Sequence, residues 1–293
     1  MTEIVNYCGL SGGKDSSATM LWLIHESGLP RESLRFTFCN THNEHQYTYD
    51  HVALLSRYVQ EWGCAPVVTL EPERGFFDLA KWKKRFPSRK ARFCTQFLKV
   101  IPSREDVTAL IRAGHEVIVH SGVRAGESDL RSKLVEREFS DMFGCVINRP
   151  LLRWTLADVL AYHKRFDLPL NRLYGYGFSR VGCFPCINSN KAEVKLISIH
   201  FPERIDGIRA QEQAGFGPGG RYQSFFHAKT TPPRFHSETY VNRKGLKYSV
   251  ATIDDVVRWS HTGKRAKEPG PYLTDDFNDD ASLVCPSGGG MCE

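Results

Sequence analysis

The sequence predicts an α/β fold, a parallel, twisted sheet with helices on both faces, followed by a smaller irregular C-terminal region. Short apolar or alternating runs recur along the first half of the chain, and polar turn residues bound them, as is typical of strands. Between these runs, apolar residues recur at helical spacing. Strands that alternate with helices form parallel sheets, and this alternation fades in the last third of the chain.

The chain has 293 residues and a formal net charge of +6. This length suits one large domain with a full core, and the mild positive charge favours an anionic ligand without separating nucleotides from nucleic acids. No apolar run approaches membrane-spanning length, and residues 1–10 lack the charged and apolar regions of a signal peptide. We therefore expect a cytoplasmic protein with no membrane partner.

The first strand, an apolar run from Ile4 to Leu10, leads into a glycine turn and then a helix. In such a turn the backbone N–H groups face one point, the helix N-terminus favours negative charge, and Lys14 adds a donor. We therefore expect an anion site. It is not a P-loop, which needs Ser or Thr after Gly-Lys, because Asp15 follows Lys14. The residues of this loop are Ser11, Gly12, Gly13, Lys14, Asp15, Ser16 and Ser17.

Further strands are expected at residues 34–39, 67–70 and 115–120, with a helix at 49–62. Ligands of parallel sheets bind at the carboxyl ends of the strands. The glycine loop, the polar residues after the second strand and the stretch after the fourth strand should therefore surround one crevice. The polar residues include Asn40 and Thr41, which form either an ordinary turn or part of the ligand pocket.

Residues 81–92 hold seven Lys or Arg and no Asp or Glu. Such a run is usually a solvated charged face. Here Trp82 and Phe86 stand among the cations, and mixed aromatic and cationic side chains suit stacking on nucleic acid and neutralising it. Both interpretations of Lys81–Arg92 remain open at this point.

Nine cysteines in a chain without a secretion signal argue for thiol or metal chemistry, not for a disulfide framework. Cys183 and Cys186 have the C-x-x-C spacing of zinc sites, iron–sulfur clusters and redox pairs. A thioredoxin-like pair is disfavoured, because the motif does not open the helix of a βαβ unit. Cys145, in a predicted strand, is expected in the core.

Thr155 is a predicted N-cap, and Asp158 completes its capping box. From about residue 196 the pattern changes to a glycine-rich stretch, a proline-containing turn, a short helix over 253–259 and a polar tail. We therefore divide the chain into residues 1–195, a domain built around the glycine loop, and residues 196–293, an appendage over the crevice without an independent core.

The run Ser-Gly-Gly-Lys-Asp-Ser, in its strand–turn–helix context, resembles the signature of the PP-loop ATP pyrophosphatases. In that family the loop holds the pyrophosphate of ATP, and the reaction occurs at the α-phosphorus. The resemblance implies that this loop binds ATP with Mg²⁺. Lys14 would stabilise charge that develops on pyrophosphate, and Asp15 would be a partner for the metal.

Further motifs follow in the order seen in the phosphoadenylyl-sulfate (PAPS) and adenylyl-sulfate (APS) reductase-like branch of this superfamily. They lie at residues 92–102, 121–134 and 149–186, so the chain resembles that branch over about residues 4–190. The resemblance implies that the segment after the fourth strand binds the nucleotide and its phosphates. The alternative is surface ion pairing on a helix. The residues concerned are Gly122, Arg124, Glu127, Ser128 and Arg131.

Two departures separate this chain from the reductases of the branch. Those reductases have a degenerate loop and end in a Glu-Cys-Gly-x-His that carries the catalytic cysteine. Here the loop is intact and the tail carries Cys285 and Cys292 instead. Both departures favour ATP-dependent sulfur insertion, as in DNA phosphorothioation or tRNA thiolation, with a nucleic-acid acceptor and a cysteine desulfurase as sulfur donor. The alternatives are a PAPS or APS reductase that uses a tail cysteine, and a non-catalytic nucleotide-gated nucleic-acid-binding module with structural zinc.

The same resemblance implies a [4Fe-4S] cluster held by Cys94, Cys183 and Cys186. APS reductases have a Cys-Cys pair in the segment that contains Cys94, and here Phe93 replaces one member of the pair. The fourth ligand is Cys292 or Cys285, or it is no protein residue at all. Structural zinc is the alternative metal.

Overall fold

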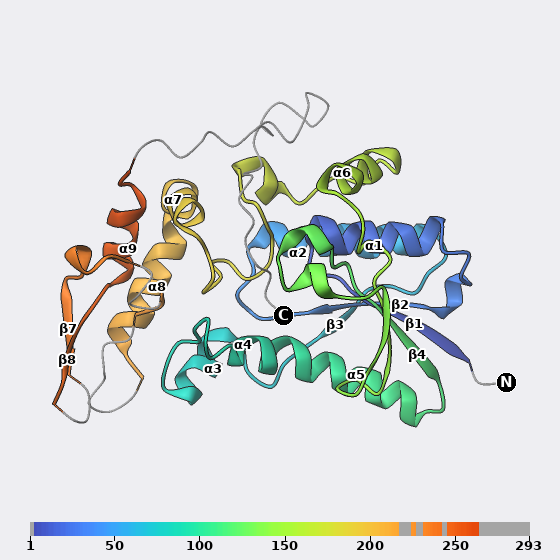
Figure 1. Ribbon diagram of the computed structural model, residues 1–293, viewed down its shortest axis with the longest axis horizontal. Coiled ribbons are helices and arrows are strands. Elements are labelled where there is room, and N and C mark those ends of the chain that lie inside the picture. Colours follow the sequence, from blue (N-terminus) through green and yellow to red (C-terminus); the bar gives the residue numbers. More distant parts are fainter. Residues whose placement is uncertain (1–2, 217–223, 227–230, 242–244, 264–293) are drawn as a thin grey trace.

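The computed structural model describes residues 3–216, 224–226, 231–241 and 245–263. A sheet with helices on both faces forms one end of the molecule, and a smaller group of helices with a two-stranded hairpin forms the other (Figure 1). No helix in the part of the chain that the structure describes is long and apolar enough to span a membrane.

The main sheet has six strands in the order β3-β2-β1-β4-β6-β5. All neighbouring strands are parallel except β5 and β6, so the predicted, mostly parallel sheet is confirmed. The antiparallel edge strand β5 was not expected. A short turn with Gly144 at φ +66° joins β5 to β6, and so short a connection permits only an antiparallel pair. The strands are β1 Ile4–Gly9, β2 Leu34–Cys39, β3 Val68–Leu70, β4 Glu116–His120, β5 Arg137–Ser140 and β6 Cys145–Asn148.

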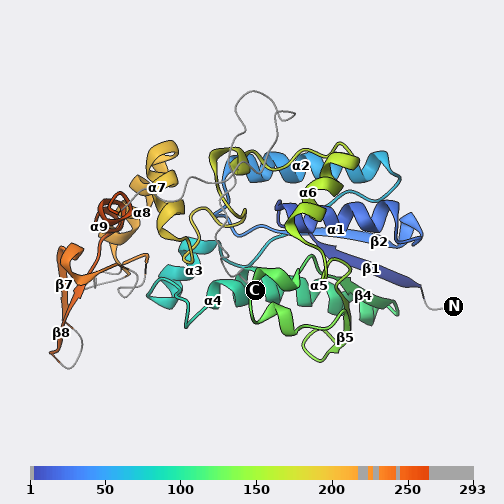
Figure 2. The same ribbon diagram turned by 45° about the horizontal axis from the view of Figure 1, so that its top comes forward.

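Helices cover both faces of this sheet (Figures 1 and 2). The face with the glycine loop's helix carries α1 Lys14–His25, α2 Gln46–Glu61 and α6 Leu156–Arg165. The other face carries α3 Phe76–Lys83, α4 Phe93–Thr95 and α5 Ile101–Arg112. Side chains alternate between faces along a strand. Accordingly, Tyr7 packs in the cluster beside α5, and Cys8 packs in the cluster beside α1.

Thr155 caps α6 and forms the predicted capping box with Asp158, whose backbone N–H donates to Oγ1 of Thr155 at 3.2 Å. Short turns of helix connect the larger elements. They are η1 Arg31–Ser33, η2 Gln96–Val100, η3 Ala125–Glu127, η4 Arg131–Lys133, η5 Arg172–Tyr176 and η7 Pro233–Phe235.

The C-terminal region contains α7 Lys191–His200, α8 Pro202–Ala214, α9 Ile253–Ser260 and the hairpin of β7 Glu238–Val241 with β8 Lys247–Val250. Its buried residues Ile197, Ile208 and Ile253 belong to one apolar cluster with Phe76 and Leu98 of the sheet region. The two regions therefore share a core. The division at residues 195 and 196 stays a prediction, and it falls inside α7.

Candidate active site

The loop between β1 and α1 is a tight turn built around two glycines. Gly12 has a φ of +72°, and a Cβ there would lie 2.9 Å from Cγ2 of Thr48, so only glycine fits. Gly13 is the N-cap of α1 and makes no side-chain cap hydrogen bond. The N–H of Ser11 donates to Oγ of Ser16 at 3.1 Å, which ties the turn to the helix. This conformation directs the start of α1 at the loop, an arrangement that favours an anion.

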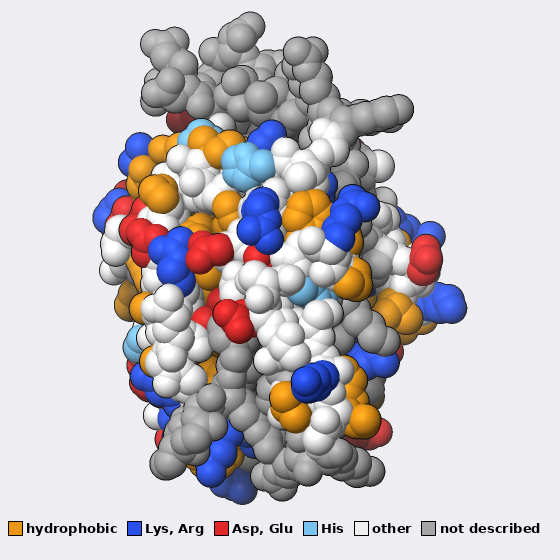
Figure 3. Space-filling view, turned by 90° about the vertical axis from the view of Figure 1, so that its left-hand side faces the viewer, with side chains coloured by type: hydrophobic (Ala, Val, Ile, Leu, Met, Phe, Trp, Pro, Cys, Tyr) orange, Lys and Arg blue, Asp and Glu red, His pale blue; other side chains and the backbone are white. Residues whose placement is uncertain are grey.

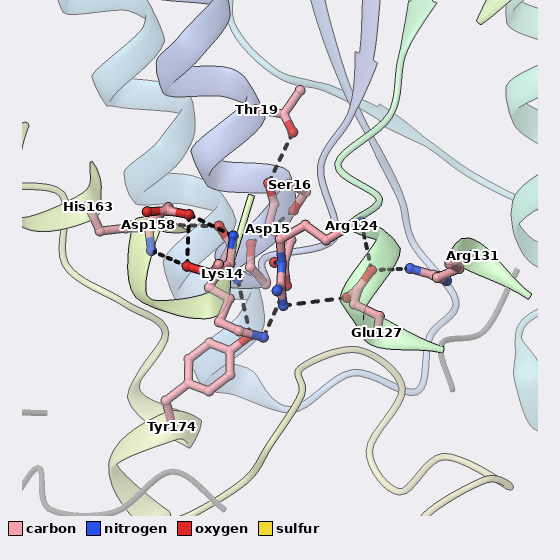
Figure 4. Close-up of polar contacts among 12 residues, drawn as sticks. Lys14, Asp15, Ser16, Thr19, Arg124, Glu127, Arg131, Asp158, His163 and Tyr174 are labelled. Carbon is pink, nitrogen blue, oxygen red and sulfur yellow. Dashed lines mark hydrogen bonds and ion pairs between the residues drawn. The ribbon is translucent and has the colours of Figure 1, made fainter. Parts of the chain in front are cut away.

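Three buried charged side chains meet beside this loop (Figure 4). Nζ of Lys14 lies 3.0 Å from Oδ2 of Asp15, and Nε of Arg124 lies 2.5 Å from Oδ1 of the same carboxylate. Burial alone would raise the pKa of Asp15, but the charges and hydrogen bonds of Lys14 and Arg124 outweigh it and hold that pKa below its ordinary value. Two cations therefore share this ionised carboxylate, and Nη2 of Arg124 also lies 3.9 Å from Oε1 of Glu127.

The network continues outward through η3 and η4. The backbone N–H of Arg124 donates to Oε2 of Glu127 at 2.9 Å, and Nη1 of Arg131 donates to the same oxygen at 2.5 Å. Arg124 and Arg131 are buried. The alternative of ion pairing on a helix surface holds in part: Arg131 pairs with Glu127, but both arginines are buried. The structure brings Arg124, Glu127 and Arg131 together with the loop, and their contact with a nucleotide stays a prediction.

Gly122 lets the segment after β4 approach the first turn of α1. A Cβ at this position would lie 2.8 Å from the backbone oxygen of Asp15 and 2.9 Å from Oγ1 of Thr19. The backbone of Asp15 in the first turn of α1 cannot move to relieve a contact of this length. The absence of a side chain at Gly122 therefore allows Arg124 to reach Asp15.

Three side chains that the sequence reasoning missed hold the loop from the opposite side. His163 on α6 places Nε2 2.8 Å from the backbone oxygen of Lys14, and Asn171 donates from Nδ2 to the oxygen of Gly12 at 3.3 Å. The hydroxyl of Tyr174 accepts the backbone N–H of Lys14 at 3.0 Å. Asn171 and Tyr174 lie in the segment that carries the family resemblance, which was the one signal for them in the sequence.

Asn40 and Thr41 lie at the carboxyl end of β2, but their side chains are bonded to protein groups. Nδ2 of Asn40 donates to Oε1 of Glu71 at 2.9 Å. Thr41 is fully buried, and its Oγ1 donates to Oε1 of Glu44 at 2.6 Å. A role for either residue in nucleotide binding stays a prediction.

The three cysteines expected to act together do line one cavity. Cys94 lies in α4, and Cys183 and Cys186 lie in the connection between η5 and α7. The sulfur of Cys183 is 3.4 Å from Oγ1 of Thr41, and it donates to Oε1 of Glu44 at 3.9 Å. The other lining residues are Thr41, Phe76, Thr95, Leu98, Lys99 and Ile187.

Cysteine thiolates bind both iron–sulfur clusters and zinc, so the donor atoms suit either group. The cavity, of about 10 Å³, has the space of roughly one water molecule. Within the described ranges, no three His, Cys, Asp or Glu side chains are arranged to hold a metal ion. Cys285 and Cys292 lie outside the described residues. The cluster and its ligands therefore stay a prediction.

The basic run Lys81–Arg92 begins on α3 and is partly exposed. Trp82 is 49% exposed, and the cations of Arg74 and Lys83 lie 4.9 Å and 4.0 Å from its ring centroid. Phe86 is buried in the apolar core, so the expectation that its ring stacks on nucleic acid is wrong. Trp82 alone remains available for that role in this run.

The far end of the molecule has a different surface, on which cationic and acidic side chains are intermixed (Figure 3). Nη2 of Arg209 on α8 lies 2.7 Å from Oδ1 of Asp254, and Nη2 of Arg258 lies 2.7 Å from Oδ1 of Asp255. These two arginines are therefore paired with carboxylates of α9, and Arg209 also pairs with Asp206 of α8. The basic run is therefore the better candidate for contact with a polyanion.

Comparison with known proteins agrees with the motifs. An uncharacterized 37.8 kDa protein of Escherichia phage 186 is 32% identical over 333 aligned positions, which cover 99% of this chain and 97% of that protein. An adenosine 5'-phosphosulfate reductase of Geobacillus thermodenitrificans is 32% identical over 155 positions, which cover 51% of this chain and 60% of the reductase. Among solved structures, the U34-tRNA thiolase NcsA of Methanococcus maripaludis, with its [4Fe-4S] cluster, has a TM-score of 0.41 and 16% identity over 73% of each chain.

The family model of the phosphoadenosine phosphosulfate reductase domain matches residues 6–189, more than half of the chain. The matched segment contains the loop at the start of α1, the charged network around Asp15, and all three cysteines of the cavity. The predicted resemblance is thus confirmed, and this chain belongs to the phosphoadenosine phosphosulfate reductase domain family.

Proposed function

We propose that this chain cleaves ATP between the α and β phosphates and transfers adenylate to an acceptor for sulfur insertion. The observation that carries the proposal is the pair of buried cations, Lys14 and Arg124, beside an intact loop at the start of α1. Each cation has N–H donors beyond the one bonded to Asp15. They can bind a polyphosphate while the carboxylate keeps them in place.

In this reaction negative charge builds up on the departing pyrophosphate. The ammonium of Lys14, the guanidinium of Arg124 and the N-terminus of α1 stabilise that charge in a site from which most water is excluded. Asp15 orients both cations. Because its pKa is held low, it stays ionised at neutral pH and keeps this role throughout the reaction.

ATP normally carries Mg²⁺, and the sequence suggested Asp15 as a partner for the metal. Both oxygens of Asp15 are engaged by cations in this structure. Each oxygen keeps a further lone pair, but a metal bound there would lie close to the positive charges of Lys14 and Arg124. We therefore assign Asp15 the orienting role, and we propose that Mg²⁺ enters with the phosphates of ATP.

We propose that Cys94, Cys183 and Cys186 hold a [4Fe-4S] cluster. When bound by three cysteines, such a cluster supplies an iron atom with an open position for sulfide. The residues of this chain supply the thiol ligands and their surroundings. Thr41 lies next to the sulfur of Cys183. The apolar side chains of Phe76 and Leu98 form part of the cavity wall and exclude water from it.

The proposed acceptor is a nucleic acid that contacts Lys81–Arg92. Exposed Trp82 with Arg74 and Lys83 around its ring offers both stacking and positive charge. A cysteine desulfurase is the proposed sulfur donor.

A second candidate function is reduction of PAPS or APS. The description of the matched family and the similarity to an APS reductase over half of the chain favour it. A reductase would release sulfite from PAPS or APS in a thioredoxin-dependent reaction, and Cys292→Ser would abolish it. We expect no such release, because the tail lacks the Glu-Cys-Gly-x-His of the reductases.

Product analysis tests the proposed function directly. The purified full-length chain with ATP should release AMP and pyrophosphate. Lys14→Ala should lower the rate by about 10²–10³-fold through lost charge stabilisation. Lys195→Ala, on the exposed side of α7, is the matched control and should leave the rate unchanged. Release of ADP and phosphate instead would contradict attack at the α-phosphorus.

A further inference from the structure

Tyr174 is placed at the proposed phosphate site by a segment far away in the sequence. It lies in η5, its side chain is 1% exposed, and its hydroxyl accepts the backbone N–H of Lys14 at 3.0 Å (Figure 4). The ammonium of Lys14 lies 5.4 Å from the centroid of the tyrosine ring. Tyr174 therefore meets Lys14 twice, with a hydrogen bond to its backbone N–H and a cation–π contact to its ammonium.

The hydroxyl of Tyr174 accepts a hydrogen bond from the protein but does not donate one to any residue that the structure describes. A tyrosine hydroxyl donates one hydrogen bond as well as accepting. Among the residues that the structure describes, none accepts a hydrogen bond from this O–H. Burial raises the pKa of Tyr174 above its ordinary value, and this outweighs the opposing charge of Lys14. The hydroxyl therefore carries its proton at neutral pH.

The position of this proton matters because the hydroxyl lies close to the glycine loop. A Cβ on Gly13 would lie 3.3 Å from the hydroxyl oxygen. Gly13 precedes Lys14 at the start of α1, where an anion would meet the helix N-terminus. An anion in that place is an acceptor for the otherwise unpaired O–H of Tyr174.

We propose that Tyr174 is a pyrophosphate-binding residue, which donates its O–H to a phosphate oxygen while it keeps the N–H of Lys14. This inference rests on the proposed function, since it assumes that the loop holds the pyrophosphate of ATP. Accepting the N–H polarises the hydroxyl and strengthens its own donation. The backbone N–H of Lys14 at the start of α1 thus acts through the hydroxyl of Tyr174 on a phosphate oxygen that this N–H does not contact.

The competing role for Tyr174 is a simple cap of the Lys14 amide in the empty protein. The two roles predict opposite results for Tyr174→Phe. If the hydroxyl is a ligand, its removal weakens the binding of pyrophosphate. If the hydroxyl is only a cap, its removal frees the amide for the ligand, and binding is unchanged or tighter.

The experiment compares wild type, Tyr174→Phe and Tyr162→Phe by calorimetric titration with inorganic pyrophosphate and, separately, with AMP. Tyr162 is a matched control, because it is also buried but packs its ring against Trp154 and Phe166. Tyr174→Phe should weaken pyrophosphate binding by roughly tenfold or more, as expected for a lost hydrogen bond to a charged group. Its affinity for AMP should stay the same, which a general structural defect would not allow. Tyr162→Phe should change neither affinity.

Wild-type protein provides a second measurement in case Tyr174→Phe does not fold. A phenol that begins to donate to an anion shows a red-shifted absorption, so pyrophosphate should produce a tyrosine difference spectrum in wild type and in Tyr162→Phe. Absence of this spectrum would overturn the inference.

The titrations separate the inference from the proposed function. If wild type turns over ATP and Tyr174→Phe binds pyrophosphate as tightly as wild type or more tightly, the role of Tyr174 is overturned alone. If wild type binds pyrophosphate and the variant binds it more weakly, but ATP yields no AMP, Tyr174 keeps its role and the proposed function fails. If wild type does not bind pyrophosphate, both are overturned.

Discussion

The loop at the start of α1 and the cysteine cavity lie in the same half of the molecule but are built on different principles. At the loop, Lys14, Asp15 and Arg124 are buried together, and their charges are paired within 3.0 Å. The cavity gathers sulfur atoms, with the apolar side chains of Phe76 and Leu98 in its wall. The connection between α6 and α7 contributes to both places.

This difference explains why the geometry of the loop suggests its proposed ligand in the ligand-free structure, whereas the geometry of the cysteine cavity does not. If the loop binds phosphate as proposed, its turn, glycines and ion pairs are already in place without the ligand. A metal centre takes its final geometry from the metal, because binding and local folding are coupled. The cavity brings Cys94, Cys183 and Cys186 to one place, and their binding of a cluster stays a proposal. The following experiments test this contrast.

The largest effect is expected at the cavity. Cys94→Ser, Cys183→Ser and Cys186→Ser should each lose nearly all iron and sulfide from anaerobically purified protein, because three protein ligands leave none to spare. Chemical analysis and visible absorbance measure both. Cys145→Ser, in the core beside α5, is the control and should keep the cluster.

Full iron content in Cys94→Ser would show that these three cysteines do not share a cluster. A colourless protein that contains zinc would favour the structural-zinc alternative. Partial iron loss in Cys292→Ser or Cys285→Ser would identify the fourth ligand.

The next effect concerns the charges at the loop. Asp15→Asn should reduce the free energy of unfolding by about 3–5 kcal/mol, because it leaves Lys14 and Arg124 buried without their shared counter-charge. Urea unfolding measures the loss. Exposed Asp141→Asn is the matched control and should stay within about 0.5 kcal/mol of wild type. Saturating ATP should restore more stability to Asp15→Asn than it adds to wild type, and equal gains would argue against phosphate at this site.

A smaller effect is expected from pH. Burial, aided by the charge of Lys14, lowers the pKa of His163 below its ordinary value of 6.5. The backbone oxygens of Lys14 and Leu168, which face its two ring nitrogens, act in the opposite direction but do not outweigh burial. Because folding lowers this pKa, the contribution of His163 to stability is present above pH 6.5 and is lost as the pH falls below that value. Between pH 6.5 and 5.5, wild type should therefore lose more stability than His163→Gln. His200→Gln, at an exposed site, should behave as wild type, and equal slopes in all three proteins would refute a buried neutral His163.

The smallest effect concerns the basic run. If Lys81–Arg92 contacts a nucleic-acid backbone, the logarithm of affinity for a single-stranded oligonucleotide should fall linearly with the logarithm of salt concentration. The double variant Lys83→Ala/Lys84→Ala should reduce that slope by about one or two units. Arg209→Ala, whose guanidinium is paired with Asp254, should keep the wild-type slope. An unchanged slope in the double variant would identify the run as a solvated face.

Local signals in the sequence predicted most of the sheet region. The strand at 34–39 was predicted with its observed bounds, and the cap at Thr155 formed as its capping box indicates. Both depend on neighbouring residues. The glycine loop was recognised for the same reason, since its chemistry lies within seven consecutive residues.

Contacts between distant segments were not predictable in this way. His163, Asn171 and Tyr174 reach the loop only because α6 and η5 pack beside α1, and no pattern in one sequence states that packing. Phe86 shows the same limit. Its cationic neighbours suggested a surface residue, but the C-terminal region supplies Phe216 and Phe225, which bury its ring.

The three contacts that hold the loop also determine when the loop can reach its final conformation during synthesis of the chain. Gly12 and Lys14 leave the ribosome early, but their partners follow 149 to 160 positions later. The first strands and α1 can associate as the chain emerges, because they lie close together in sequence. The loop receives its last contact only when Tyr174 has been released. In a nascent chain that stalls before α6, the loop has therefore been synthesised but lacks the contacts of His163, Asn171 and Tyr174 that hold its conformation.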